Sequence, residues 1–270
     1  MSQQPQSSTI RASIRIFLFI AWCILLASLQ TLFLFFRFKN KLWLPMIFHR
    51  GCCRILGFHI QVTGELTEQK TVLFVSNHIS YVDVIILGGV LSGSFVAKAE
   101  VAKWPLLGGL AKLQDTLFIE RVSLQVKNHL SLMQNALNTQ RNLILFPEGT
   151  SGNGNHVLPF KSALFRVVET ESDNAPLVQP VTVAYTHCDN IVMTQALRDY
   201  YAWYDDTPLL THFFRMAGMR SVSIQIMLHP AVKGSNFASR KALAEYCQLQ
   251  VAQGLEKALS THSVEGVKLQ

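Results

Sequence analysis

Acidic residues are missing from the first part of this 270-residue chain, in which Glu65 is the first carboxylate. The preceding stretch carries seven lysines and arginines, whereas the rest of the chain holds equal numbers of basic and acidic residues. A nucleic-acid-binding protein is expected to carry its positive charge on the folded domain, so this distribution argues against a nucleic-acid partner. Basic residues confined to the most apolar part of the chain indicate contact with anionic lipid headgroups.

Several motifs of common catalytic sites are also absent. The five cysteines are odd in number and show no Cys-x-x-Cys pair, and neither they nor the histidines have the spacing of metal ligands. This pattern favours a reducing, cytoplasmic environment, and we expect no metal and no cofactor. There is no Gly-x-Ser-x-Gly motif of serine hydrolases. Gly149 and Gly154 have the spacing of a phosphate loop, but Asn155 and His156 follow in place of Lys-Ser/Thr, so a nucleotide site is unsupported.

A long uncharged segment, residues 16–36, lies near the N-terminus. Its 21 residues are enough for a helix to cross a bilayer core of ~30 Å, and they are too long for the apolar region of a signal peptide. Basic residues flank it on both sides, so the positive-inside rule gives no orientation. A second apolar segment, residues 42–56, contains Pro45, Arg50 and Arg54. The two segments could form a spanning helix or a hairpin dipping into one leaflet, and we expect residues 1–57 to associate with a membrane.

Residues 58–270 have the pattern of one folded domain. Period-two and apolar runs predict strands at 59–64, 71–76, 94–98, 116–120, 142–146, 177–185 and 221–228. Helices are expected near 81–91, 104–113, 123–138, 161–170 and 240–259. Strands that alternate with helices indicate an α/β fold with a layered mixed sheet and flanking helices.

His78 and Asp83 follow the apolar run that ends at Val75. An apolar strand that turns into a helix at this point would leave His78 at an exposed junction, with Asp83 about one and a half turns further on. A carboxylate that fixes the tautomer of a histidine and stabilises its protonated form is the minimal unit of general-base catalysis. Asp near a helix start is ordinarily a cap, so the pair alone leaves both readings open.

A second strand pattern, residues 142–146, runs into the polar, glycine-rich segment Pro147 to Gly154. Two such strand ends can converge on the edge of a sheet where open α/β folds bind ligands. Four motifs follow one another along the chain: Asn77-His78 with Asp83, Phe118-Ile119-Glu120-Arg121, Phe146-Pro147-Glu148-Gly149-Thr150, and Val178-Gln179-Pro180-Val181. In this order they resemble the motifs of the glycerolipid acyltransferase family, which includes bacterial 1-acyl-glycerol-3-phosphate acyltransferases, over about residues 60–235.

The resemblance implies a reaction and its residues. An acyl group would pass from an acyl-carrier-protein or coenzyme A thioester to the free hydroxyl of a lysophospholipid, at the cytoplasmic face of the inner membrane. His78 and Asp83 would be catalytic, and Arg121 would bind the phosphate of the acceptor. Glu148, Gly149 and Thr150 would contact the acceptor or the oxyanion through hydrogen bonds. Lys98, which is otherwise an ordinary surface charge, would polarise the donor carbonyl or bind an anionic donor.

Ser151 departs from the pattern, since family members that use lysophosphatidic acid commonly have arginine directly after Glu-Gly-Thr. We expect the acceptor to be lysophosphatidic acid, which would make the product phosphatidic acid. The alternative acceptor is a lyso-ornithine lipid. A catalytically silent, membrane-bound lipid-binding protein would bind lipid without turnover. A thioesterase would release free fatty acid without an acceptor.

Four further parts of the chain have structural expectations. Residues 104–110, rich in apolar side chains and glycine, could line an acyl groove, although packing in the core is the ordinary role of such residues. The aromatic residues 200–204 could form an interfacial belt or pack internally. Pro180 predicts that its strand lies at a sheet edge or contains a bulge. The first ten residues, which are polar, are expected to be a tail.

Overall fold

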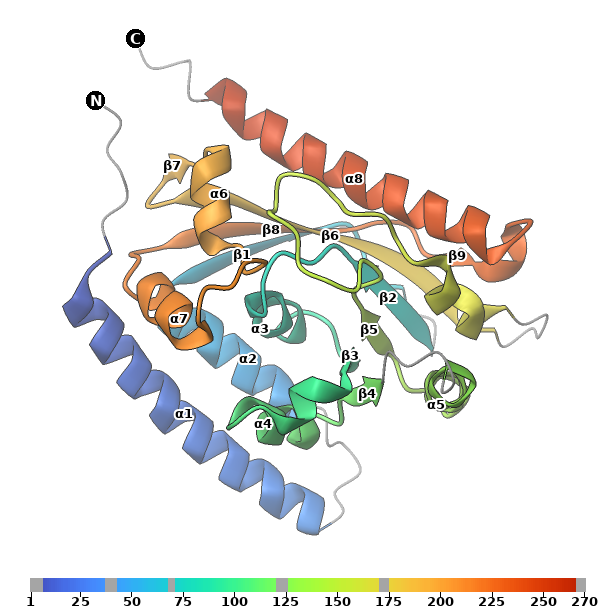
Figure 1. Ribbon diagram of the computed structural model, residues 1–270, viewed down its shortest axis with the longest axis horizontal. Helices are drawn as coiled ribbons and strands as arrows, with labels where there is room; N and C mark the ends of the chain where they lie inside the picture. The colour runs from blue at the N-terminus through green and yellow to red at the C-terminus, as the bar shows by residue number, and fades with distance from the viewer. Residues whose placement is uncertain (1–6, 37–42, 68–70, 120–125, 170–174, 266–270) are drawn as a thin grey trace.

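The computed structural model describes residues 7–36, 43–67, 71–119, 126–169 and 175–265. A mixed β-sheet forms its centre, with the strand order β1-β8-β6-β2-β5-β3-β4 (Figure 1). Neighbours in this order run parallel, except for the antiparallel pair β6 and β8. The strands are β1 (Phe58–Thr63), β2 (Val72–Ser76), β3 (Ser94–Lys98), β4 (Leu117–Ile119), β5 (Leu143–Leu145), β6 (Leu177–Cys188), β7 (Ile191–Val192), β8 (Val222–Leu228) and β9 (Val232–Lys233). The parallel strands β2, β5, β3 and β4 therefore end at the same edge of the sheet.

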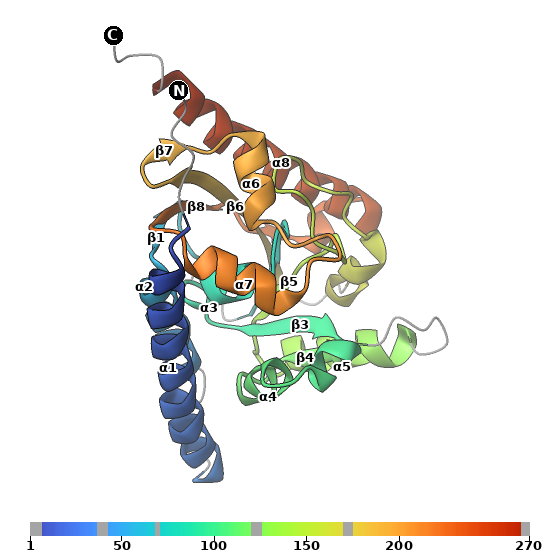
Figure 2. The ribbon, with the colours of Figure 1, turned by 60° about the vertical axis from the view of Figure 1, so that its left-hand side comes forward.

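Helices cover both faces of this sheet, which confirms the predicted layered α/β fold (Figures 1 and 2). Helices α2 and α3 lie over one face, with α1 and α7 packed outside them, while α8, α5 and the 3₁₀ segment η3 lie over the other. The α-helices are α1 (Thr9–Phe35), α2 (Trp43–Leu56), α3 (Val82–Gly88), α4 (Leu107–Leu113), α5 (Val126–Asn138), α6 (Gln195–Tyr201), α7 (Leu209–Ala217) and α8 (Arg240–Glu265). The 3₁₀ segments are η1 (Ala99–Lys103), η3 (Ser162–Val168) and η4 (Gly234–Asn236).

Strand β2 shows why the sequence folds in this way. All five of its residues are buried. Val72 and Phe74 belong to the core beneath α2 and α3, while Leu73 and Val75 belong to the core beneath α5 and α8. A strand covered on both faces needs apolar side chains at every position, which explains its continuous apolar run.

Pro180 does not mark an edge strand. Strand β6 lies inside the sheet, between β2 and β8. Along one side of β6 there are two antiparallel partners in succession. Strand β9 pairs with Leu177 and Val178, and β8 begins to pair at Val181. Pro180 lies opposite this change of partner, and its carbonyl accepts a hydrogen bond from the backbone N–H of His229 (3.0 Å). A residue without an N–H group is tolerated there because the ladder is already interrupted.

The N-terminal helix begins earlier than expected. Ser8 caps α1, which starts at Thr9 inside the segment predicted to be a tail. Backbone and side-chain contacts hold this end of the helix to the turn after α7, where Arg11 donates to the carbonyl of Gly218 (2.9 Å). Near the other end of α1, Gln30 donates to the carbonyl of Leu113 (3.0 Å) in α4. The long helix therefore packs against α2 and α7 and is held to the folded domain near both of its ends (Figures 1 and 2).

Candidate active site

His78 and Asp83 form a hydrogen-bonded pair where β2 leads into α3. His78 follows the end of β2 by two residues, and Asp83 lies in the first turn of α3. The Nδ1 atom of His78 is 2.9 Å from Oδ2 of Asp83, whose side chain is fully buried, whereas 18% of the His78 side chain is exposed. With Nδ1 donating to the carboxylate, Nε2 carries the lone pair that a general base requires.

Asp83 is held by three more donors. The backbone N–H groups of Ile79 (2.6 Å) and Ser80 (2.9 Å) also donate to Oδ2, and the hydroxyl of Tyr185 donates to Oδ1 (2.9 Å). A buried carboxylate is costly unless its oxygens accept hydrogen bonds. These donors therefore both offset the cost of burial and fix the orientation in which Asp83 meets His78.

The imidazole of His78 is fixed as well. Its ring stacks on Phe146, with 4.0 Å between centroids and an angle of 18° between planes. The backbone N–H of His78 donates to Oε1 of Glu148 (3.2 Å), and its carbonyl accepts from the N–H of Gly152 (2.8 Å). The segment after β5 thus contacts His78 on three sides, which joins the first and third motifs in one site.

Asn77 holds the end of β2 against β6. Its Oδ1 accepts from the N–H of Val183 (2.8 Å), and its Nδ2 donates to the carbonyl of the same residue (2.9 Å). Regular pairing between β2 and β6 ends at Ser76 and Val181. The asparagine side chain therefore continues the ladder beyond the last backbone pair and sets the point where the chain leaves the sheet.

Glu148 is buried behind His78, with 3% of its surface exposed, and it does not line the groove described below. Burial raises the pKa of its carboxyl group from 4.5 to about 8. The hydrogen bond from the His78 backbone lowers this pKa, and the nearby charge of Asp83 raises it. In this structure the residue supports the backbone of His78.

Replacing Glu148 with glutamine is expected to remove a pH-dependent contribution to stability. The folded chain retains a proton on Glu148 that the unfolded chain releases above its ordinary pKa of 4.5. The stabilisation is complete below that value and is lost as pH rises through about 8. Thermal unfolding of the two proteins from about pH 5 to about pH 9 should show the wild type losing stability relative to the variant. Parallel curves over this range would contradict the expectation.

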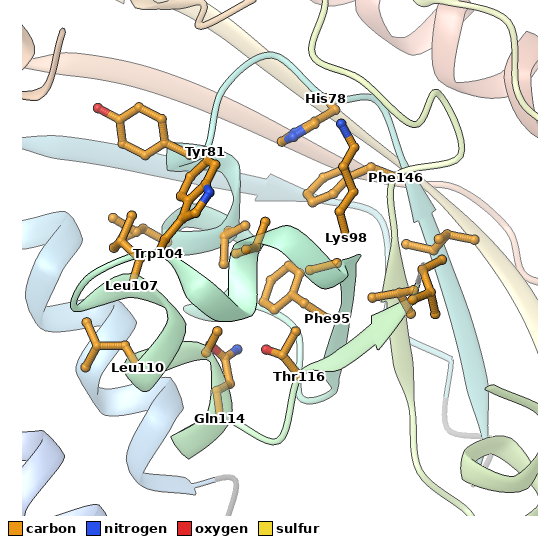
Figure 3. Close-up of a pocket in the computed structure, with 18 of the residues that line it drawn as sticks. His78, Tyr81, Phe95, Lys98, Trp104, Leu107, Leu110, Gln114, Thr116 and Phe146 are labelled. Carbon is orange, nitrogen blue, oxygen red and sulfur yellow. The ribbon is translucent and has the colours of Figure 1, made fainter. Parts of the chain in front are cut away.

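Three of the other proposed binding residues line a groove. Lys98, Gly149 and Thr150 line it, and Lys98 extends alongside His78 above Phe95 and Phe146 (Figure 3). Arg121 lies outside the described residues. Lys161, to which the sequence motifs gave no role, also lines the groove, and its ammonium group packs against Gly149. Gly149 has a positive φ of 69°, and a Cβ there would meet the Lys161 side chain.

The groove has a volume of about 900 Å³ and runs from His78 between the sheet and the helices α1, α2 and α4. Trp104, Leu107 and Leu110 line one wall (Figure 3). The sequence left two roles open for these residues, an acyl groove or ordinary packing in the core. They line the groove because η1 and α4 cover it from the side. Gln114 and Thr116 lie at the end away from His78 (Figure 3). A long apolar groove that opens beside a histidine suits an alkyl chain whose reactive end lies at His78.

Aromatic side chains form the rim near His78. Trp203 packs edge-on against both Tyr81 (5.4 Å between centroids) and Trp104 (5.9 Å). The backbone N–H of Trp203 also donates to the carbonyl of Ile79 (3.0 Å). Part of the 200–204 segment therefore packs internally, while Tyr204 is half exposed.

Known proteins resemble this chain in sequence and in fold. A family model described as Acyltransferase matches residues 59–184. A lyso-ornithine lipid O-acyltransferase of Brucella abortus is 37% identical over 257 residues, covering 92% of this chain and 96% of that protein. A 1-acyl-sn-glycerol-3-phosphate acyltransferase of Neisseria meningitidis is 29% identical, covering 66% of this chain and 67% of that protein. The crystal structure of the 1-acyl-sn-glycerophosphate acyltransferase PlsC of Thermotoga maritima matches with a TM-score of 0.61 and 20% identity, covering 91% of this chain and 97% of that one.

Proposed function

This chain belongs to the acyltransferase family and acylates lysolipids, and from this premise we propose that its acceptor is a lyso-ornithine lipid. Family membership confirms the resemblance carried by the four motifs. The relatives of Brucella abortus and Rhizobium meliloti, which cover 92% and 88% of this chain, are both named lyso-ornithine lipid O-acyltransferases. Ser151 lines the groove. At this position, family members that use lysophosphatidic acid commonly carry an arginine. These observations favour ornithine over the phosphate acceptor that the motifs alone place first.

The hydrogen-bonded pair His78 and Asp83 is the observation that carries the mechanism. We propose that Nε2 of His78 takes the proton from the free hydroxyl of the acceptor, whose oxygen attacks the carbonyl carbon of an acyl thioester. A C–O bond forms, the tetrahedral oxyanion collapses, and the C–S bond breaks. His78 returns its proton to the leaving thiolate. Asp83 stabilises the imidazolium in between, so the enzyme needs no nucleophile of its own.

Two kinds of group are positioned to stabilise the oxyanion. Lys98 lines the groove alongside His78 (Figure 3), and Thr150 and Ser151 line it as well, so that we propose their backbone N–H groups as the second kind. Preorganised donors are most effective where water is excluded, and the apolar walls of the groove provide such an environment. We propose that these groups bind the thioester carbonyl as it becomes tetrahedral.

We also propose that the protein binds one leaflet, at the cytoplasmic face of the inner membrane. α1 is the one helix in the described chain that is long and apolar enough to cross a bilayer. However, both of its ends are hydrogen-bonded to the folded domain, through Arg11 and Gln30. Its outer face exposes large apolar side chains, such as Phe17 (71% exposed), Ile24 (64%) and Phe35 (79%). A helix attached along its length presents this face to the side of a membrane and does not span it.

An acyl-transfer assay with the detergent-solubilised full-length protein tests the acceptor. Lyso-ornithine lipid and 1-acyl-glycerol-3-phosphate are offered separately, each with acyl-carrier-protein and coenzyme A thioesters. We expect product from the ornithine acceptor. The Ser151→Arg variant should show a higher ratio of the rate with the phosphate acceptor to the rate with the ornithine acceptor. Product from the phosphate acceptor alone would overturn the proposal in favour of phosphatidic acid synthesis. Lipid binding without product would favour a silent binding protein, and free fatty acid without an acceptor would favour a thioesterase.

A further inference from the structure

Within the described parts of the chain, one oxygen of the Asp83 carboxylate has a single hydrogen-bond donor. Its Oδ2 accepts hydrogen bonds from His78 and two backbone N–H groups, whereas Oδ1 accepts from the Tyr185 hydroxyl, 2.9 Å away. Tyr185 lies on β6, 102 residues further along the chain, and 1% of its surface is exposed. It does not line the groove, so its hydroxyl touches Asp83 and not a bound substrate.

We infer that Tyr185 is a positioning residue for acyl transfer, whose hydroxyl orients Asp83 and thereby sets the orientation and proton affinity of His78. This inference rests on the proposed roles of His78 and Asp83. A carboxylate turns about the bond to its Cβ unless both oxygens are held. Three donors on Oδ2 lie on one side of Asp83, and the Tyr185 hydroxyl holds the other side.

Toward the carboxylate of Asp83, the Tyr185 hydroxyl acts as the donor. Burial raises the pKa of its phenol well above the usual value, and the neighbouring charge of Asp83 acts in the same direction. The phenol therefore keeps its proton over the whole pH range in which the enzyme can be assayed. A hydrogen bond to a charged acceptor inside a protein is stronger than one between neutral groups.

The fold brings Tyr185 to Asp83 through the register of β6. Asn77 binds both backbone groups of Val183, which fixes this strand next to the end of β2. Side chains two residues apart in a strand point to the same face, so Tyr185 lies on the same side as Val183, in the core beneath α3. The same asparagine that ends β2 thus aligns the tyrosine with the carboxylate.

Other titratable groups around Asp83 and Tyr185 come from several elements. His78 precedes α3, and Tyr81 lies at its start. The others are Glu148 after β5, Cys53 on α2 and Tyr201 on α6. Burial raises the pKa of Cys53 to about 12 and that of Glu148 to about 8. Glu148 therefore titrates in the assay range, but it does so in wild type and variant alike and cancels in the ratio of their rates.

Tyr185→Phe tests the inference, with Tyr201→Phe as the matched control. Both tyrosines are fully buried in the same core with ring centroids 6.1 Å apart, but the Tyr201 hydroxyl bonds to the Cys188 thiol (3.2 Å) instead of Asp83. With the acceptor and donor that wild type uses, Tyr185→Phe should lower kcat/KM about tenfold near neutral pH, with KM little changed. Tyr201→Phe should stay within about twofold of wild type.

The pH profile separates positioning from a merely structural role. Without the Tyr185 hydroxyl, Asp83 loses a donor that favours its charged form, and it attracts the proton of His78 more strongly. Both effects move the acidic limb of kcat/KM to higher pH. The deficit of Tyr185→Phe should therefore grow toward acid pH and shrink toward alkaline pH. A deficit that is equal at every pH, or one shared by Tyr201→Phe, would overturn the inference.

A double variant covers the case in which Tyr185→Phe merely loosens the fold. If the hydroxyl acts through Asp83, adding Tyr185→Phe to Asp83→Asn should change kcat/KM by less than about twofold. A full tenfold further loss would show that Tyr185 acts independently of Asp83 and would overturn the inference. A fully active His78→Ala variant would instead contradict the proposed mechanism itself, so the two failures are distinguishable.

Discussion

Replacing His78 with alanine is expected to lower kcat by a factor of roughly 10² to 10⁴, because the variant has no group to take the proton from the acceptor hydroxyl. His78 is partly exposed at the mouth of the groove, and its ring makes one stacking contact with Phe146. We therefore expect the variant to fold. The measurement is the rate at saturating acceptor and thioester, compared with thermal unfolding of the same preparation.

His59→Ala is the control for this experiment. His59 is an exposed residue of β1. This strand lies at the opposite end of the strand order from β3 and β4. Its removal should leave the rate near that of wild type. If the folded His78→Ala protein turned over at the wild-type rate, general-base catalysis by His78 would be ruled out.

Asp83→Asn is expected to lower kcat by a factor on the order of 10³, with a much smaller effect on folding. The amide oxygen can accept the hydrogen bonds from His78, Ile79 and Ser80, and the amide nitrogen can donate to the hydroxyl of Tyr185, which is able to accept. The shape of the site is therefore retained. What is lost is the negative charge that stabilises the imidazolium during proton transfer.

Asp83→Ala provides the comparison. Alanine leaves four donors without their acceptor in a fully buried place, and each unsatisfied group costs about 1–3 kcal/mol. We expect this variant to unfold at clearly lower temperature than Asp83→Asn, while both lose activity. A folded Asp83→Asn protein with kcat within a few-fold of wild type would show that the charge of Asp83 is not needed.

Local patterns in the sequence predicted the strands of the sheet well. The run from residue 71 to residue 76 became β2 (Val72–Ser76), and residues 94–98 became β3 with the same bounds. An uninterrupted apolar run can be read directly, since a strand buried on both faces has no alternative composition. The spacing of His78 and Asp83 was equally informative, because five residues across a strand-to-helix turn bring the two side chains together.

Elements that depend on distant contacts were missed or misjudged. Helices α6 (Gln195–Tyr201) and α7 (Leu209–Ala217) were not predicted, and residues 161–170 contain the 3₁₀ segment η3 instead of an α-helix. α6 and α7 are short, and isolated helices of such length are unstable without tertiary packing. α7 is held by its contacts with α1, about 200 residues earlier in the chain, among them the hydrogen bond from Arg11 to Gly218.

The sequence by itself determined the fold class, the family motifs and the proposed catalytic pair, because these depend on periodicity and on residues a few positions apart. The tertiary structure alone decided that Tyr185 contacts Asp83, that Asn77 contacts β6, that Glu148 lies behind His78, and that Trp104 and Leu107 line a groove. Each of these contacts depends on strand register or on helices packed from distant parts of the chain. The packing of the whole domain sets which of these residues come into contact, and local sequence patterns do not record that packing.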